Sequence, residues 1–244
     1  MGLPDQFNDI IKKHLNVFAA WMPIVTKYKL GDYGIFTNGV FASIGNITDD
    51  FKVSVTEGSG EAASIDFTSE GASITKLAGG VAVDVIPAGE VNANVEIGFS
   101  KEKSFLVKVP TITVATIDNV NEVANKLKAT GKWDGKWKVV HQVYTAIDPV
   151  IVITHEAGTK LNFSGDASAL GQMKLGSLGV NIDSNKSLGL KINGKNGVIG
   201  LGLFKLKSKI FGGFKVDVLG EDPEEEGQNA PIFLAPDDIT KDDL

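Results

Sequence analysis

The sequence predicts an α+β fold made mainly of antiparallel β-sheet, either sandwich-like or one large twisted sheet, with an N-terminal amphipathic helix and one short central helix. The first observation is a strict alternation of apolar and small polar residues between Val53 and Lys207, for example in 91–99 and 188–192. Alternation with a period of two places every apolar side chain on one face of a pleated strand. The second observation is that glycine and proline clusters separate these runs, which favours strands joined by short turns.

Two segments show helical periodicity instead. In 4–22 the apolar side chains recur every three or four positions, Pro4 suits a first turn, and Pro23 ends the segment. In 118–128 capping residues precede one apolar stripe. We therefore predict a helix over 4–22 that packs on a sheet, and a second helix over 118–128.

Length and charge suggest how the chain is divided. A chain of 244 residues suits one large β domain or two small ones. Residues 217–244 carry ten acidic residues and one lysine, whereas the rest carries 23 lysines and 20 acidic residues. We predict a single β-rich domain over 1–219 that contains both helices, and an acidic tail over 220–244 that is either disordered or docked on the surface.

The composition excludes several functions. The sequence contains neither cysteine nor arginine, so disulfides, thiolate chemistry and bidentate arginine recognition of phosphate are impossible. An isoelectric point near 5.1 further argues against a nucleic-acid partner. No run reaches the length of a membrane-spanning helix, and no basic segment precedes an apolar core at the N-terminus, so we expect a cytoplasmic protein.

Motifs for catalysis or cofactor binding are missing as well. If the strands on either side of Pro149 form a hairpin, His141 and His155 could approach each other, with Glu156 as the nearest further metal ligand. Two ordinary strand histidines are the preferred interpretation. No local motif marks a nucleophile, so we predict a protein that is not an enzyme and has no cofactor or metal site.

Two groups of residues are candidates for binding. Four lysines on or near the first helix could contact an acidic membrane or a partner, and six tail residues, three acidic and three apolar, could dock the tail. The candidate membrane or partner contacts are Lys12, Lys13, Lys27 and Lys29, and the candidate tail-docking residues are Glu224, Glu225, Glu226, Ile232, Phe233 and Leu234.

The order of these elements resembles the pore-forming N-terminal domain of the gasdermin family. The resemblance is carried by the first helix over 4–22, the alternating region over 62–99, the helix over 118–128 and the strands over 137–207. It implies that the first helix and its lysines touch acidic lipid, that the alternating regions become membrane hairpins, and that a C-terminal segment restrains the resting state. The chain departs from the family in having no cysteine for lipidation, no arginine cluster and no evident protease site before the tail.

Two functions therefore stay open. The favoured one is a non-enzymatic binding or assembly protein that uses sheet edges, loops and the acidic tail to meet a protein partner or a second copy of itself. The alternative is a gasdermin-like pore-forming protein whose alternating strands insert into a membrane while the tail acts as the resting-state restraint. Small polar residues opposite the apolar face are compatible with both.

Overall fold

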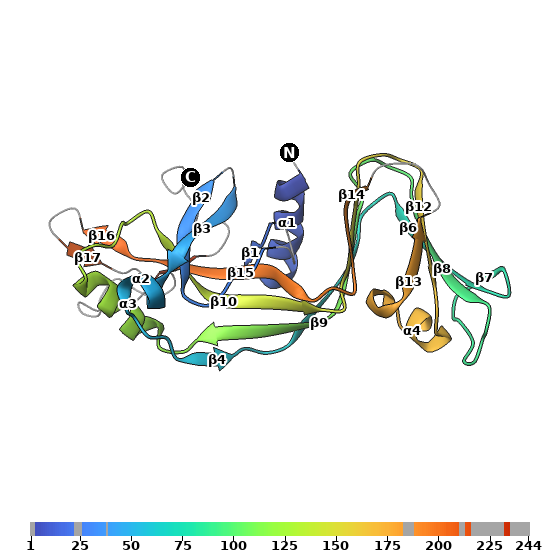
Figure 1. The fold of residues 1–244 in the computed structure, drawn as a ribbon. Coiled ribbons are helices and arrows are strands. Elements are labelled where there is room, and N and C mark those ends of the chain that lie inside the picture. Colours follow the sequence, from blue (N-terminus) through green and yellow to red (C-terminus); the bar gives the residue numbers. More distant parts are fainter. Residues whose placement is uncertain are drawn as a thin grey trace, which may run out of the picture. The chain divides into compact units, whose positions relative to one another are not determined.

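The computed structural model describes residues 3–21, 26–37, 39–182, 188–209, 213–215 and 232–234 (Figure 1). The predicted α+β class, with mainly antiparallel sheet, is confirmed. The helices are α1 (Leu3–Leu15), α2 (Ile47–Phe51), α3 (Val120–Ala129) and α4 (Ala167–Gly171), with one 3-10 helix, η1 (Leu175–Ser177).

The chain divides into two compact units. Unit 1 comprises Met1–Glu61, Thr113–Thr145 and Gly197–Leu244, and unit 2 comprises Ala62–Ile112 and Ala146–Asn196. From the sequence we expected a single β-rich domain over 1–219, without a division into such units. The reason is that β9 (Phe105–Ile117) and β10 (Lys138–Ile147) each pass from one unit to the other within a continuous strand, so no change in composition marks the boundary.

Unit 1 is built around β10 and β15. In the strand order β15 lies between β10 and β1, β2 pairs with β10 and β3, and β4 pairs with β9. Aromatic and aliphatic side chains from these strands, including Phe36, Phe41 and Leu201, form one core, while α3 covers a second core with Val123 and Leu127. The strands that belong to unit 1 alone are β1 (Phe18–Ala19), β2 (Asp32–Thr37), β3 (Val40–Asn46), β4 (Glu57–Ser59), β15 (Gly197–Lys205), β16 (Lys207–Lys209), β17 (Gly213–Lys215) and β18 (Ile232–Leu234).

The first helix is shorter than predicted. It ends at Leu15 rather than at residue 22, because Asn16 has a φ of 54° and its N–H donates to the carbonyl of Lys12 at 2.8 Å. Asparagine adopts this left-handed conformation more readily than most residues. The apolar residues that follow form β1 on β15 (Phe18↔Leu201), so strand pairing overrides helical periodicity at this point.

Unit 2 contains the clearest alternating strand. Along β8 buried and half-buried residues alternate without exception, in register with β6 (Ile74↔Ile97) and β12 (Leu161↔Ile97). The apolar face packs into a core with α4 and η1, while the opposite face carries polar pairs such as Lys160–Glu96 at 2.9 Å. The strands of unit 2 alone are β5 (Ala63–Thr68), β6 (Ala72–Ala78), β7 (Val81–Val83), β8 (Ala93–Phe99), β11 (Val150–Thr154), β12 (Thr159–Ser164), β13 (Gly179–Ile182) and β14 (Leu188–Asn193).

The alternation of β8 predicts a strong contrast between two valines that lie four residues apart. Val95 is fully buried, whereas Val91 is 88% exposed just before the strand. Val95→Ala should lower the free energy of unfolding by about 2 kcal/mol, because it removes two methyl groups from a packed core. Val91→Ala removes the same atoms from solvent and should change stability by less than about 0.5 kcal/mol. Urea denaturation of both variants measures the difference, and equal effects would contradict the burial of this face.

Candidate functional site

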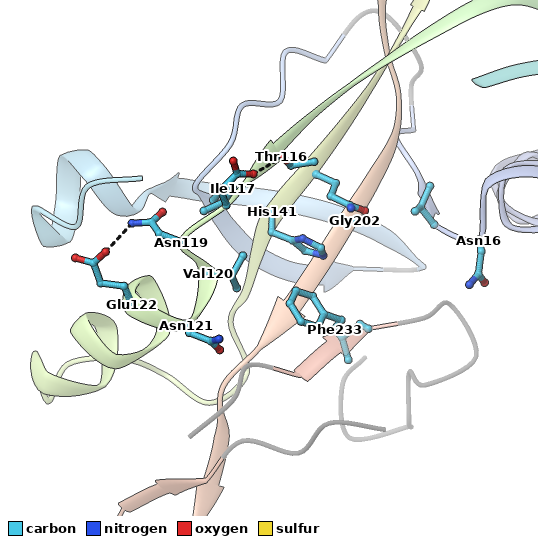
Figure 2. Close-up of a pocket in the computed structure, with 14 residues that line it drawn as sticks. Asn16, Thr116, Ile117, Asn119, Val120, Asn121, Glu122, His141, Gly202 and Phe233 are labelled. Atoms are coloured by element: carbon cyan, nitrogen blue, oxygen red, sulfur yellow. Dashed lines mark hydrogen bonds between the residues drawn. The ribbon is translucent and has the colours of Figure 1, made fainter. Parts of the chain in front are cut away.

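A polar cleft in unit 1 is the candidate site (Figure 2). Its volume is about 870 Å³, and we call it the β15-edge cleft because it follows the edge of β15. It is lined by Asn16, Val17, Thr116, Ile117, Asp118, Asn119, Val120, Asn121, Glu122, His141, Gln142, Gly202, Phe233 and Leu234. The segment after α1, the end of β9, the start of α3, and strands β10, β15 and β18 all contribute to this lining.

Two short strands from distant parts of the chain cover the edge of β15. β1 pairs with Gly200 and Leu201, and β18 pairs with the residues from Leu203 to Lys205. Gly202 stands between the two ladders and lines the cleft. A Cβ atom at this position would come within 2.6 Å of Oε1 of Gln142, so glycine leaves the Gln142 side chain its place in the cleft.

His141 lies at the centre of the lining, on β10. Its side chain is 8% exposed, and its ring centroid lies 4.8 Å from that of Phe233 and 6.0 Å from that of Phe204. Burial disfavours the charged form and lowers the pKa of His141 from 6.5 to about 4. The imidazole is therefore neutral at neutral pH and offers one N–H donor and one nitrogen acceptor.

The acidic residues of the lining are committed to internal partners at the start of α3. Asp118 accepts a hydrogen bond from the Thr116 hydroxyl at 2.9 Å. Glu122 accepts a hydrogen bond from the side-chain amide of Asn119 at 3.1 Å and pairs with Lys126 at 2.6 Å. Both contacts favour the charged carboxylate and lower the pKa of Glu122, and the hydrogen bond from Lys126 has the larger effect. These carboxylates therefore shape the rim of the cleft while their charge is partly compensated.

The remaining polar groups are carboxamides on three different elements. Asn16 lies in the left-handed turn after α1, Asn121 is exposed in the first turn of α3, and Gln142 lies on β10. Oε1 of Gln142 accepts a hydrogen bond from the Tyr144 hydroxyl at 3.3 Å. Each carboxamide has an NH2 group that donates and a carbonyl oxygen that accepts hydrogen bonds. The cleft is therefore suited to binding a polar molecule by several neutral hydrogen bonds.

The predicted site residues are divided between the cleft and other places. Phe233 and Leu234 line the cleft from β18, whose backbone also includes Ile232. Glu224, Glu225 and Glu226 lie outside the described residues. Lys12 and Lys13 lie on α1, Lys27 and Lys29 lie in the segment before β2, and none of the four lines the cleft.

The hairpin that would bring His141 and His155 together does not form. β10 and β11 are not neighbours in the strand order, because β9 separates them and β14 pairs with the other edge of β11. Within the described ranges, no group of three or more potential metal-ligating side chains occurs.

Most of the cleft was not visible in the sequence. Asn16, Gln142 and Gly202 carry no motif, and they come together only because both β1 and β18 pair with β15. The sequence did draw attention to the capping residues of the predicted central helix, to His141 and to the apolar tail residues Phe233 and Leu234, which all line the cleft. In the part of the chain that the structure describes, no helix is long and apolar enough to cross a membrane.

Comparison with solved structures gives a likeness, whereas comparison of sequences gives none. No protein-family model matches the chain, and no curated protein matches its sequence. Among solved structures, a gasdermin A3 membrane pore determined by cryo-EM matches with a TM-score of 0.38 and 11% sequence identity, over 91% of this chain and 97% of that chain. This solved structure belongs to the family whose pore-forming domain the order of the predicted elements resembles.

The burial of His141 predicts that stability depends on pH. Because the pKa of His141 is lowered to about 4 in the folded state, the imidazole binds a proton more tightly in the unfolded state. Above pH 6.5 the ring is neutral in both states, so His141 does not affect the free energy of unfolding. Between pH 6.5 and about 4 the free energy of unfolding falls, and the total decrease is about 3 kcal/mol. We expect His141→Phe, which keeps a ring but cannot be protonated, to remove this part of the pH dependence. Urea denaturation across this pH range tests it, and identical profiles for both proteins would contradict it.

Proposed function

We propose that this protein is a non-enzymatic binding and assembly module that accepts an extended segment of a partner at the edge of β15. The observation that supports this proposal is the pairing of β18 with β15, in which three residues near the C-terminal end of the chain occupy the edge (Leu203↔Leu234, Phe204↔Phe233, Lys205↔Ile232). Addition of a strand to an exposed sheet edge is a recurring mode of recognition, in which backbone hydrogen bonds supply affinity and side-chain pockets supply specificity.

The short ladder makes β18 replaceable. Leu234 is 6% exposed and joins a core that includes Leu203, whereas Phe233 is 48% exposed. Burial of one leucine and a few ladder hydrogen bonds contribute about 4 kcal/mol, and ordering three residues costs about 3–6 kcal/mol. These terms nearly cancel, so a longer incoming strand with an apolar residue at the position of Leu234 can compete for the edge.

The charge of the chain suits the same function. The acidic residues of 217–244 give that segment a net charge of −9, against +3 for the rest. Release of β18 would present this acidic segment to a partner, and a lysine- or arginine-rich surface would attract it. The partner is then either a second copy of this chain, whose body is mildly basic, or another protein with a basic surface.

A peptide exchange experiment tests the proposal. Leu234→Asp in the full chain should release β18, because a buried carboxylate without a partner is costly. A fluorescent peptide with the sequence of residues 228–238 should then bind this variant at least about tenfold more tightly than it binds the natural protein, in which the resident strand competes. Fluorescence anisotropy measures both affinities.

A matched peptide and a second measurement sharpen this experiment. The same peptide with Leu234→Asp should not bind the variant, because it cannot fill the pocket of Leu234. Light scattering after size-exclusion chromatography should show that the Leu234→Asp protein self-associates more than the natural one. If the natural peptide fails to bind the variant, strand exchange at β15 is ruled out.

Membrane insertion is the second candidate function, and exposed valines in unit 2 favour it. Val81, Val85 and Val91 are 67%, 74% and 88% exposed within one short segment from β7 to the start of β8. Exposed apolar side chains are typical of surfaces that meet a membrane or a partner, and we call these three valines, which lie close together in the sequence, the valine cluster. In this proposal the valine cluster meets the bilayer first, the alternating strands leave their core to form membrane hairpins, and β18 restrains the resting state.

Dye leakage from liposomes that contain acidic lipid tests this second function. We expect the Leu234→Asp protein to release dye faster than the natural protein, because its β18 is undocked. Replacement of all three valines of the cluster by serine in this background should slow leakage at least about tenfold, since each loses apolar area that enters the bilayer. Ile44→Ser, at a residue of unit 1 that is 54% exposed, serves as the control. Absence of leakage with both the natural and the Leu234→Asp protein excludes pore formation under these conditions.

A further inference from the structure

We infer that the β15-edge cleft binds a neutral polyhydroxylated ligand, that is, a saccharide. The inference concerns a ligand site that the strand-exchange function does not require. It depends on the hydrogen-bonding character of the cleft, on one exposed phenyl ring, on the compensated charge of the rim, and on the size of the cavity.

The central polar side chain of the cleft is buried but available. His141 is 8% exposed, and within the described residues no hydrogen bond involves its ring nitrogens, although its ring contacts Phe233 and Phe204. The ring nitrogens are not among the fully buried side-chain atoms that lack a partner, so solvent reaches them and a ligand in the cleft can take the place of that water. Figure 2 shows the ring of His141 beside that of Phe233 among the lining residues, so a ligand in the cleft can reach it.

The polar groups match hydroxyls better than ions. A sugar hydroxyl both donates and accepts, and neutral imidazole and carboxamides do the same. His141 supplies such a group at the centre, and Asn16, Asn121 and Gln142 supply three more from separate elements. Because these groups surround the cavity, a ligand with hydroxyls in several directions can satisfy most of them at once.

The charges of the rim disfavour ionic ligands. An anion at the N-terminal end of α3 would face the carboxylates of Asp118 and Glu122, which line the same cleft, and none of the lining residues within the described part of the chain is a lysine. A cation at Glu122 would have to compete with Lys126, which already pairs with that carboxylate. A neutral ligand meets neither penalty.

The phenyl ring of Phe233 supplies the apolar surface that a sugar ring also needs. It is 48% exposed and lies at the cleft, against His141. A pyranose presents C–H groups on one face and hydroxyls at its edges, so an aromatic floor surrounded by hydrogen-bonding groups fits both parts. The volume of about 870 Å³ lies within the range typical of small-molecule sites and is large enough for more than one sugar ring.

Saturation-transfer NMR with the full-length protein tests the inference. The probes are glucose, N-acetylglucosamine and maltotriose, with glucose phosphate as the charged counterpart. We expect transfer from the protein to at least one neutral sugar, and weaker transfer to the phosphorylated sugar. Titration should show that His141→Phe lowers affinity at least about tenfold, because the ring stays but its hydrogen bonds are lost. His141→Gln should keep more of the affinity, because a carboxamide also donates and accepts.

Further variants separate ligand contact from a loss of structure. Asn121→Ala changes an exposed residue of the lining and should weaken binding without unfolding the chain, which circular dichroism checks. Ile44→Ala, at an exposed apolar residue outside the lining, should leave the affinity unchanged. The inference is overturned if no neutral sugar receives saturation from the natural protein, or if transfer persists unchanged in folded His141→Phe and Asn121→Ala.

Discussion

The need to cover the edge of β15 that faces away from β10 is the constraint on which the arrangement of unit 1 depends. A strand edge left open would expose a row of backbone donors and acceptors and invite uncontrolled pairing with other chains. The protein covers the edge with two very short strands, β1 from the segment after the first helix and β18 from the last described segment. These short strands protect the edge of β15 in the resting chain, yet each of them is attached to β15 by only a few backbone hydrogen bonds.

The same closure creates the cleft. β1 ends its pairing at Leu201 and β18 begins at Leu203, so the intervening Gly202 pairs with neither strand, and its lack of a side chain leaves room for Gln142 of β10. The polar side chains of β10 and the start of α3 line the cleft at this point. Burial of His141 against Phe233 then depends on β18 staying in place. The neutral state of the imidazole, the shape of the cleft and the docking of the C-terminal segment are thus linked properties of one edge.

The sequence predicted features that depend on local periodicity and missed those that depend on pairing between distant segments. The alternation in β8 and the apolar stripe of α3 were sufficient to place a one-sided strand and a short helix. The end of α1 could not be placed, because the apolar residues after Asn16 continue a helical pattern while they pair with β15. The tail residues Phe233 and Leu234 were singled out for their apolar character and His141 as a possible partner of His155, but the contact between His141 and Phe233 was not foreseen, since only the strand order brings these residues together.

Ligand binding and strand exchange at this edge would be coupled. A sugar that contacts Phe233 binds only the state in which β18 is docked, so it stabilises that state by the free energy of its own binding. By thermodynamic reciprocity, an incoming strand that displaces β18 removes the phenyl ring from the cleft and weakens sugar binding by the same factor. Protonation of His141 acts in the same direction as the incoming strand, because a charged imidazole is more stable when its ring is released from burial. One sheet edge could therefore combine three inputs, a neutral ligand, a competing strand and acidification, without any contact beyond those that hold β18 in place.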